Sequence, residues 1–344
     1  MSEKRVTIAD IADELGVSTA TVSNVIHGKT KKVSSETVRR VQALLEEKRY
    51  IPSMAGVLLA RNSSGIIGVV VNDHEKYESH VLEDAFIASS LNALSAEIEK
   101  AGYFMMVKVT GNWQEIVRLA SMWNMEGLVV IGFCEQDYKS LRDAMHIPFV
   151  IYDGYLTGAK RLCNLTIDNY QGGYQMGAYF YRMGHRNVLC ISDNEICMDW
   201  ERKEGFFAAM KEGQADFRMI PMEKTERKRY YTDNLEILKR YSGIFAVSDY
   251  YAVELIQFLQ QHNIRVPEEI SVAGFDDTPL CELIVPALTT IRQDNRQRAK
   301  VALELLKGLK AGTVSGGSYQ FPTVLVERQS VCHVPQIEHM SEKL

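Results

Sequence analysis

Three short segments near the N-terminus carry apolar residues at the spacing of an amphipathic helix. Their apolar positions are, in turn, Ile8, Ile11, Ala12 and Leu15; Ala20, Val22, Val25 and Ile26; and Val38, Val41 and Leu45. Thr7, Ser18 and Ser34 precede the three segments and are favourable N-caps, while Gly16 and Gly28 are placed to end the first two. The pattern predicts three helices, of which the first two form a helix-turn-helix.

The outward face of the second predicted helix is polar and uncharged. It carries small polar groups that are able to reach base edges or phosphates: Thr19, Thr21, Asn24 and His27. Residues 1–61 contain ten Lys and Arg against seven Asp and Glu, a net charge of +3, whereas the whole chain has −5 and the remainder therefore −8. Attraction to phosphate is thus confined to this module, which we interpret as a DNA-binding head. The alternative is a small helical bundle with a solvated basic face.

From Gly65 onward, short β-branched runs alternate with longer amphipathic helical patterns. The runs are "IIGVVV", "FMMVKV", "GLVVIGF", "PFVIYD", "NVLCIS", "GIFAVSD" and "ISVAGFDD". Apolar strands linked by helices indicate parallel sheets that are covered on both faces, and so many units in about 270 residues favour two doubly wound lobes. The predicted fold class is therefore α/β, with an all-α head.

The composition is that of a soluble globular chain: 344 residues, 46% hydrophobic and 24% charged. No apolar run reaches membrane-spanning length, and the N-terminus lacks the apolar core of a signal peptide, so we expect a cytoplasmic protein without membrane partners. The six cysteines lack pair spacing and are expected to be reduced and buried, most of them in strands. They are Cys134, Cys163, Cys190, Cys197, Cys281 and Cys332.

Polar residues follow several of the predicted strands. They are Asn72 and Asp73, Asp153, Ser248 and Asp249, and Asp276 and Asp277. Ligands of open parallel sheets bind at the carboxyl ends of the strands, so these positions predict a site for a polar small molecule. Each Asp taken singly also suits a helix N-cap or a loop acceptor.

Sequence motifs of catalysis are missing. No glycine-rich nucleotide fingerprint follows the first strand, and there is no phosphate-loop motif. The eight histidines form no metal pair, and no serine lies in a nucleophile-elbow pentapeptide. We therefore predict a protein that is not an enzyme and that needs neither a cofactor nor a metal.

The chain resembles the lactose-repressor/galactose-repressor family of bacterial transcription regulators from about Val6 to Glu327. The motifs that carry the resemblance occur in order: "VTIADIADELGVSTATVSNVI", "YIPSMAGVLLA", "IGVVV", "DNYQGGYQMGAYFYRMGHRNV", "ERKEGF", "AVSD", "VPEEISVAGFDDTPL" and "PALTTIRQD". The resemblance implies a head (1–52), a hinge helix and linker (53–64) and a body (65–344) related to periplasmic sugar-binding proteins. It also implies an N-lobe of about 65–164 plus 293–322, a C-lobe of about 165–292 plus 323–344, and three crossings between them.

By the same resemblance, the head contacts a pseudo-palindromic operator as part of a homodimer. Thr19 and Ala20 are expected to meet bases, with Asn24 one turn later at a position where arginine is more usual. The positions that resemble phosphate contacts are Thr7, Ser18, Ser23, His27, Ser34 and Thr37. Thr21 belongs to the same outward face, Lys32 is placed to approach a base or phosphate, and Leu59 matches a leucine that the family wedges into the minor groove.

For the effector, the resemblance implies that Asp153, Arg202 and Asp276 hydrogen-bond polar groups of a small sugar-like molecule. Trp200 is expected either to stack on the ligand or to fill the core. The remaining predicted effector-binding residues are Asn72, Tyr77, Phe133, Ser248, Asp249 and Gln293. The loop after the first strand departs from the family pattern, and we place His74, Tyr77, Glu78 and His80 at the cleft or its rim.

The sequence thus predicts an effector-responsive repressor in which ligand binding biases lobe closure and changes the spacing of two heads. A free-standing solute-binding protein and an enzyme on a similar scaffold are the alternatives. The C-terminal "RQSVCHVPQIEHMSEKL" is short and polar, so it does not favour a tetramer built through a leucine-heptad tail. The identity of the effector, and whether it weakens or strengthens operator binding, stay open at this stage.

Overall fold

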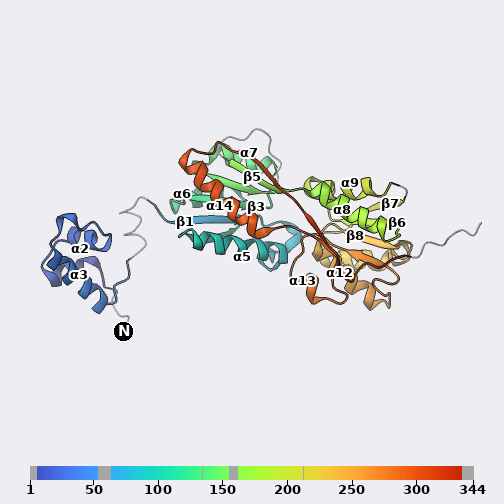
Figure 1. The fold of residues 1–344 in the computed structure, drawn as a ribbon, viewed down its shortest axis with the longest axis horizontal. Coiled ribbons are helices and arrows are strands. Elements are labelled where there is room, and N and C mark those ends of the chain that lie inside the picture. The colour runs from blue at the N-terminus through green and yellow to red at the C-terminus, as the bar shows by residue number, and fades with distance from the viewer. Residues whose placement is uncertain (1–5, 53–62, 134, 155–161, 212, 335–344) are drawn as a thin grey trace, which may run out of the picture. The chain divides into compact units, whose positions relative to one another are not determined.

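The chain folds into two compact units, Met1–Ser64 and Gly65–Leu344, each with its own core (Figure 1). The computed structural model describes residues 6–52, 63–133, 135–154, 162–211 and 213–334. In these described ranges, no helix is both long enough and apolar enough to cross a bilayer. The hinge residues 53–62, with the predicted minor-groove residue Leu59, lie outside the described residues.

The first unit is a bundle of three helices, which we call the head. It comprises α1 (Ile8–Leu15), α2 (Thr19–Ile26), the 3-10 turn η1 (Thr30–Lys32) and α3 (Ser35–Glu47). The predicted N-caps are confirmed: Thr7, Ser18 and Ser34 each accept a hydrogen bond from the backbone of the first turn that follows. Gly16 ends α1 in the left-handed conformation, at φ 65°.

Two details of the predicted head were wrong, and a third was confirmed. Ala20 is exposed, because the short helix α2 buries only Val22 and Val25. In α3 the buried residues are Val41, as predicted, and Leu44, whereas Val38 and Leu45 are only partly buried. The glycine expected to end α2 does so: Gly28 follows the C-cap His27 in the left-handed conformation, at φ 69°, and the Lys29 N–H donates to the Asn24 carbonyl at 2.8 Å.

The first lobe of the body, the N-lobe, contains a six-stranded parallel sheet. The sheet order is β11 (Gly317–Phe321), β5 (Leu162–Ile167), β4 (Phe149–Tyr152), β3 (Gly127–Ile131), β1 (Ile66–Val71) and β2 (Phe104–Val109). One apolar cluster joins the sheet to α5 (Ala85–Lys100) and α14 (Asn295–Ala311). A second cluster joins the opposite face to α6 (Trp113–Met122) and α7 (Glu135–Ala144). Because both faces are covered, the central strands are apolar throughout.

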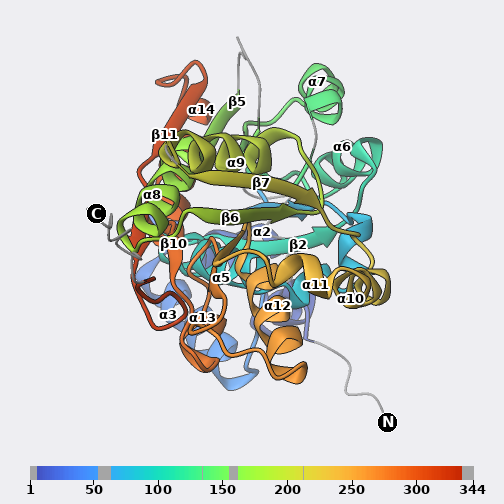
Figure 2. The same cartoon turned by 90° about the vertical axis from the view of Figure 1, so that its right-hand side faces the viewer.

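The second lobe, the C-lobe, contains a four-stranded parallel sheet. Its order is β7 (Gln214–Met219), β6 (Asn187–Ser192), β8 (Gly243–Ala246) and β9 (Ser271–Ala273). Figure 2 shows α8 (Asn169–Arg182) and α9 (Cys197–Ala209) on one side of this sheet. The helices on the other side are α10 (Lys224–Asp233), α11 (Leu235–Leu238), α12 (Asp249–Gln261) and α13 (Leu280–Leu283).

The described chain passes between the two lobes three times, as the resemblance implied. It leaves the N-lobe after β5, returns after β10 (Thr290–Arg292) to form α14 and β11, and leaves again through β12 (Val324–Val326). Strands β10 and β12 pair antiparallel, so two of the three crossings support each other. The two 3-10 turns η2 (Glu75–Tyr77) and η3 (Val81–Glu83) lie in the loop that follows β1.

All seven strands expected from the sequence are present, but five others were not anticipated. The missed strands are β5, β7, β10, β11 and β12. Strands β7 and β11 lie at sheet edges and are largely half-buried or exposed, so their polar residues gave no apolar run. The cysteine prediction was also partly wrong: of the five described cysteines, all free, only Cys163 and Cys190 lie in strands.

Helices α8 and α9 approach each other backbone to backbone, and glycines at the contact make this possible. A Cβ atom on Gly173 would lie 1.9 Å from the carbonyl oxygen of Arg202, and one on Gly205 would lie 1.9 Å from that of Tyr170. On Gly177 it would lie 2.4 Å from the Phe206 carbonyl oxygen. These glycines therefore fix the position of α9, and with it the position of Arg202.

We predict that Gly173→Ala lowers the free energy of unfolding by about 2 kcal/mol, because the added methyl group meets backbone that cannot rotate away. Urea unfolding of the full chain measures the change. The matched control is Gly308→Ala in α14, where the new atom would meet the side chain of Val314 rather than backbone. A Gly173→Ala midpoint equal to that of the wild type would contradict this account of the helix pair.

Candidate functional site

In the head, the residues predicted to contact phosphate lie at the N-termini of the helices. Thr7 forms a reciprocal capping box with Asp10. Ser18 Oγ lies 2.9 Å from Thr21 Oγ1, and Ser34 Oγ lies 2.8 Å from Thr37 Oγ1. Hydroxyl pairs at helix N-termini suit phosphate oxygens, because the positive end of the helix dipole lies beside them.

The face of α2 that was predicted to meet bases is accessible. Thr19 and Ala20 are exposed, and Ser23, Asn24 and His27 are half-buried along the same helix or at its C-cap. Lys32 is exposed in η1, directly after α2. The head thus brings the predicted base-contacting residues together on one short helix, with lysines at its C-terminal end.

In the body, two of the polar residues that follow strands, Asp153 and Asp276, lie at the boundary between the two lobes. Asn72 follows β1, and its side-chain amide donates to the Gly132 carbonyl at 2.8 Å, which joins the ends of β1 and β3. Asp153 follows β4 with φ 57°, and Asp276 follows β9 with φ 120°. Such values are rare for residues other than glycine, and they occur where surrounding contacts hold the backbone.

Arg202 extends from α9 into the C-lobe side of this boundary and is 5% exposed. Its Nε donates to Asn169 Oδ1 at 2.9 Å and its Nη1 donates to the Val247 carbonyl at 2.7 Å. The guanidinium carbon lies 3.7 Å from the centroid of the Phe275 ring. The predicted cleft arginine is therefore held in one orientation, with Nη2 directed to Asp276 Oδ1 at 3.7 Å.

Asp276 continues into a chain of buried polar contacts that reaches the N-lobe. Gln293 Nε2 donates to Asp276 Oδ1 at 2.6 Å, and Arg298 Nη1 donates to Gln293 Oε1 at 3.2 Å. Arg298 Nη2 lies 2.7 Å from Asp153 Oδ2. We call Arg202, Asp276, Gln293, Arg298 and Asp153 the interlobe chain. Burial raises the pKa of Asp276 well above its ordinary value.

Asp249 has a different place from the one predicted. It is fully buried beneath the strand ends, where Oδ1 accepts from Thr290 Oγ1 at 2.6 Å and Oδ2 accepts from Thr278 N–H at 2.7 Å. Cys281 Sγ also donates to Oδ2 at 3.0 Å, and burial raises the pKa of Asp249 to about 6. Both oxygens are engaged, and the preceding Ser248 is the N-cap of α12. The side chains of Ser248 and Asp249 are therefore engaged within the body itself.

The three predicted aromatic contacts are dispersed. Phe133 is buried in the N-lobe cluster beneath α6 and α7, and Trp200 is 48% exposed on α9. Neither belongs to the interlobe chain. Tyr77 is half-buried in η2, and burial raises its pKa to about 12. Its ring packs against the N-lobe cluster that contains α5 and α14.

The loop after β1 reaches across to the C-lobe. Glu78 Oε1 accepts from the Lys224 backbone N–H at 3.1 Å, at the first residue of α10. Burial lowers the pKa of His74, and the charge of Lys76 lowers it further. His80, also predicted for this rim, lies in the open with a side-chain exposure of 68% beside Glu83.

Four charged residues at the boundary were missed by the sequence predictions. They are Lys76, Asp193, Asp199 and Arg298. Asp193 directly follows β6, so the expectation that ligands bind at the carboxyl ends of strands applies to it as well. Arg298 lies within a charged helical stretch, and nothing in the sequence distinguishes it from exposed Arg296.

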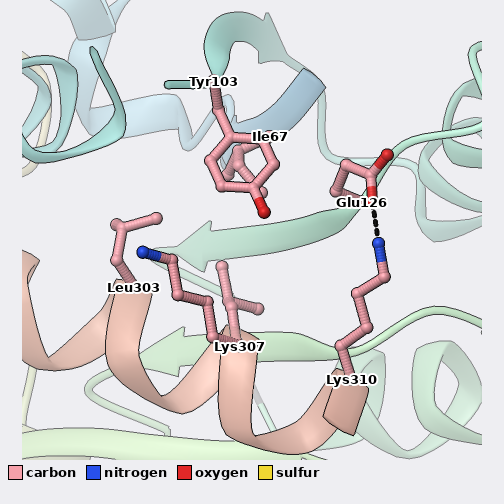
Figure 3. A pocket seen from close by; sticks show the side chains of 7 residues that line it. Ile67, Tyr103, Glu126, Leu303, Lys307 and Lys310 are labelled. Atoms are coloured by element: carbon pink, nitrogen blue, oxygen red, sulfur yellow. Dashed lines mark hydrogen bonds and ion pairs between the residues drawn. The ribbon is translucent and has the colours of Figure 1, made fainter. Parts of the chain in front are cut away.

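A small hollow lies elsewhere in the N-lobe, among Ile67, Tyr103, Leu303 and α14 (Figure 3). Lys310 pairs with Glu126 beside it. The hollow offers about 10 Å³ to the centre of a water-sized sphere, which is about the space that one bound water needs. Among the described residues there is also no cluster of three or more side chains suited to a metal ion.

Comparison with known proteins identifies both units. Residues 7–53 match the model of bacterial regulatory proteins of the lacI family, and residues 178–331 match a periplasmic binding protein-like domain. The structural match with the lac repressor dimer bound to operator and the anti-inducer ONPF covers 96% of this chain and 100% of the repressor chain. Its TM-score is 0.81 at 22% identity. The transcriptional regulator CelR in complex with cellobiose covers 95% of this chain and 100% of its own, with a TM-score of 0.68 at 20% identity.

A sequence relative extends the match along the whole chain. The HTH-type transcriptional repressor PurR of Vibrio atlanticus (strain LGP32) is 30% identical over 343 residues, which cover 94% of this chain and 98% of the relative. The two structures share the fold, and the relative shares the sequence through both units. This chain therefore belongs to the lacI family of bacterial regulatory proteins.

Proposed function

We propose that this protein is a cytoplasmic transcriptional repressor that binds operator DNA through its head and a small polar effector between the lobes of its body. The observation that carries the proposal is the exposed polar face of α2 in a head of net charge +3, joined to a body of net charge −8. Such a charge division directs nucleic acid to the head alone. The relative's name, a transcriptional repressor, supports the same function.

The proposed DNA contacts are of two kinds. Thr19, Ala20 and Asn24 meet base edges, and the capping hydroxyl groups with Lys32 meet phosphates. Because the α2 face is short and carries no arginine, one head alone discriminates weakly between DNA sequences. Two heads of a homodimer on a pseudo-palindromic operator supply the remaining specificity. The lac repressor neighbour, bound to operator as a dimer, supports this arrangement.

The proposed effector site is the lobe boundary around the interlobe chain. Buried donors and acceptors from both lobes converge there, so a ligand that enters the boundary must exchange hydrogen bonds with this chain. That exchange gives the ligand different binding energies in the closed and open arrangements of the lobes, which is what an allosteric effector needs. The cellobiose complex of CelR supports a small polar ligand.

For the head, we predict that Asn24→Ala raises the operator dissociation constant roughly tenfold, since a bidentate Asn–adenine contact is worth about 1–3 kcal/mol. Fluorescence anisotropy on a duplex selected from a random pool measures the change at fixed salt. Gln42→Ala, at an exposed position of α3, is the control and should leave affinity unchanged. Equal affinities of Asn24→Ala and the wild type would remove Asn24 from the base contacts.

For the body, we predict that Arg202→Ala abolishes the response of operator binding to effector while operator affinity without effector is retained. The reason is that Asp276 loses its C-lobe cation and Val247 loses its side-chain donor. The readout is operator affinity with and without a ligand identified by thermal-shift screening. Arg229→Ala, 85% exposed on α10, is the matched control. An unchanged effector response in Arg202→Ala would place the effector elsewhere.

A further inference from the structure

The body begins at a well-held turn directly after the hinge and linker. Gly65, its first residue, has φ 65°, a left-handed value that glycine adopts without strain and that leads the chain into β1. The Gly65 carbonyl accepts from the Phe104 N–H at 2.8 Å, and the Ile66 carbonyl accepts from the Glu126 N–H at 2.8 Å. We call Gly65 and Ile66 the body entrance. Its position determines where the hinge leaves the N-lobe.

Glu126 joins the body entrance to the C-terminal end of α14. Its Oε1 accepts from the Gly65 N–H at 3.4 Å, and its Oε2 pairs with Lys310 Nζ (Figure 3). The Glu126 side chain is 5% exposed, whereas that of Lys310 is 55% exposed. A pair of exposed charges contributes little, but a buried carboxylate gains more from its cation. The removal of Lys310 therefore weakens the hold of α14 on the body entrance.

The opposite end of α14 belongs to the interlobe chain. Arg298, the fourth residue of the helix, contacts Asp153, Gln293 and the Leu165 carbonyl. The helix lies along the N-lobe sheet (Figure 1). Twelve residues separate Arg298 from Lys310, and a rise of about 1.5 Å per residue puts their backbones about 18 Å apart. The two ends of α14 are thus too far apart to contact each other directly.

Between its ends, α14 is packed tightly against the sheet. It is a continuous helix of 17 residues, and its buried face includes Ala299, Ala302, Leu303 and Leu306. A Cβ atom on Gly127, the residue after Glu126, would lie 3.0 Å from Leu306 Cδ2. A helix packed this closely responds to a changed contact at one end by a small shift as a unit.

We propose that α14 transmits the state of the interlobe chain to the hinge, and that Glu126 and Lys310 are the positioning residues at its far end. A change in the contacts of Arg298 shifts α14, and the Lys310–Glu126 pair passes this shift to the body entrance. The inference rests on the proposed function, because it needs a head that binds operator DNA. It goes beyond that function by assigning a role to two residues that contact neither DNA nor effector.

A double-mutant cycle on operator affinity tests this transmission without an effector. Arg298→Lys keeps the charge but loses the planar group that contacts three partners at once. Lys310→Gln removes the pair with Glu126 at a largely exposed position. We expect Arg298→Lys to change the operator affinity of the wild-type chain by about fivefold or more. In the Lys310→Gln chain, the same substitution should change it by less than about twofold. Fluorescence anisotropy at fixed salt, on a duplex selected from a random pool, measures both effects.

Lys307→Gln is the matched control. Lys307 lies one turn earlier on α14, is exposed and lines the same hollow, but makes no hydrogen bond or ion pair within the described part of the chain (Figure 3). In the Lys307→Gln chain, Arg298→Lys should keep its full effect on operator affinity. Lys310→Arg retains the cation and should preserve that effect as well.

Urea unfolding of the same variants separates transmission from a structural role. A purely structural Lys310–Glu126 pair would alter the free energy of unfolding and leave the effect of Arg298→Lys on operator affinity intact. Because distant sites act independently on stability, we expect Arg298→Lys and Lys310→Gln to have additive effects on unfolding. Their effects on operator affinity should not combine in this way.

The inference is overturned if Arg298→Lys changes operator affinity equally in the wild-type and Lys310→Gln chains, or leaves it unchanged in the wild type. If Arg298→Lys fails to fold, Asp276→Asn, which disturbs the interlobe chain from the C-lobe, replaces it under the same criteria. Equal effects in a chain that binds operator DNA contradict the transmission alone. A wild-type chain that binds no duplex DNA contradicts the proposed function itself.

Discussion

The structure of the body depends on the interlobe chain. Its members come from four separate stretches of sequence and from both lobes, and every one of their side chains is largely buried. Buried charges are tolerated only when partners satisfy them, so each member of the chain needs its neighbours. Arg298 is the clearest case, because it is 1% exposed and connects Asp153, the Leu165 carbonyl and Gln293. A ligand that binds at the boundary acts on this set of contacts as a whole.

Several elements of the surrounding fold hold the interlobe chain in place. The glycines of α8 and α9 allow the backbone contact that positions Arg202, and the paired crossovers β10 and β12 position Gln293. Asp249, buried below them, accepts hydrogen bonds from Thr278 in the loop after β9 and from Thr290 in β10, and so connects this loop to β10. Conformational change at the boundary therefore involves the crossovers, which are the only described segments that connect the lobes covalently.

The sequence predicted the fold class because helical spacing of apolar residues and continuous apolar runs both indicate burial. The central strands of both sheets are buried, so their sequences show such runs. It missed β7 and β11 because edge strands need no apolar run. In the site, Asp153 and Asp276 were predicted as ligand contacts because they follow strands. Arg202 and Gln293 were predicted from the family resemblance. Neither approach could find Arg298, because a buried arginine and a solvated arginine on a charged helix look alike in sequence. Asp249 shows the converse: its position fits a ligand contact, but its oxygens are engaged within the C-lobe.

The central claim is that the two lobes share one interdependent set of buried contacts that controls operator binding. A double-mutant cycle of Asp153→Asn and Asp276→Asn in the full chain tests it most directly, read both in urea unfolding and in operator affinity. The account predicts a coupling energy of about 0.5–3 kcal/mol, because the two residues are joined through Arg298 and Gln293. Effects that add to within about 0.3 kcal/mol in both measurements would show two independent sites and contradict the account.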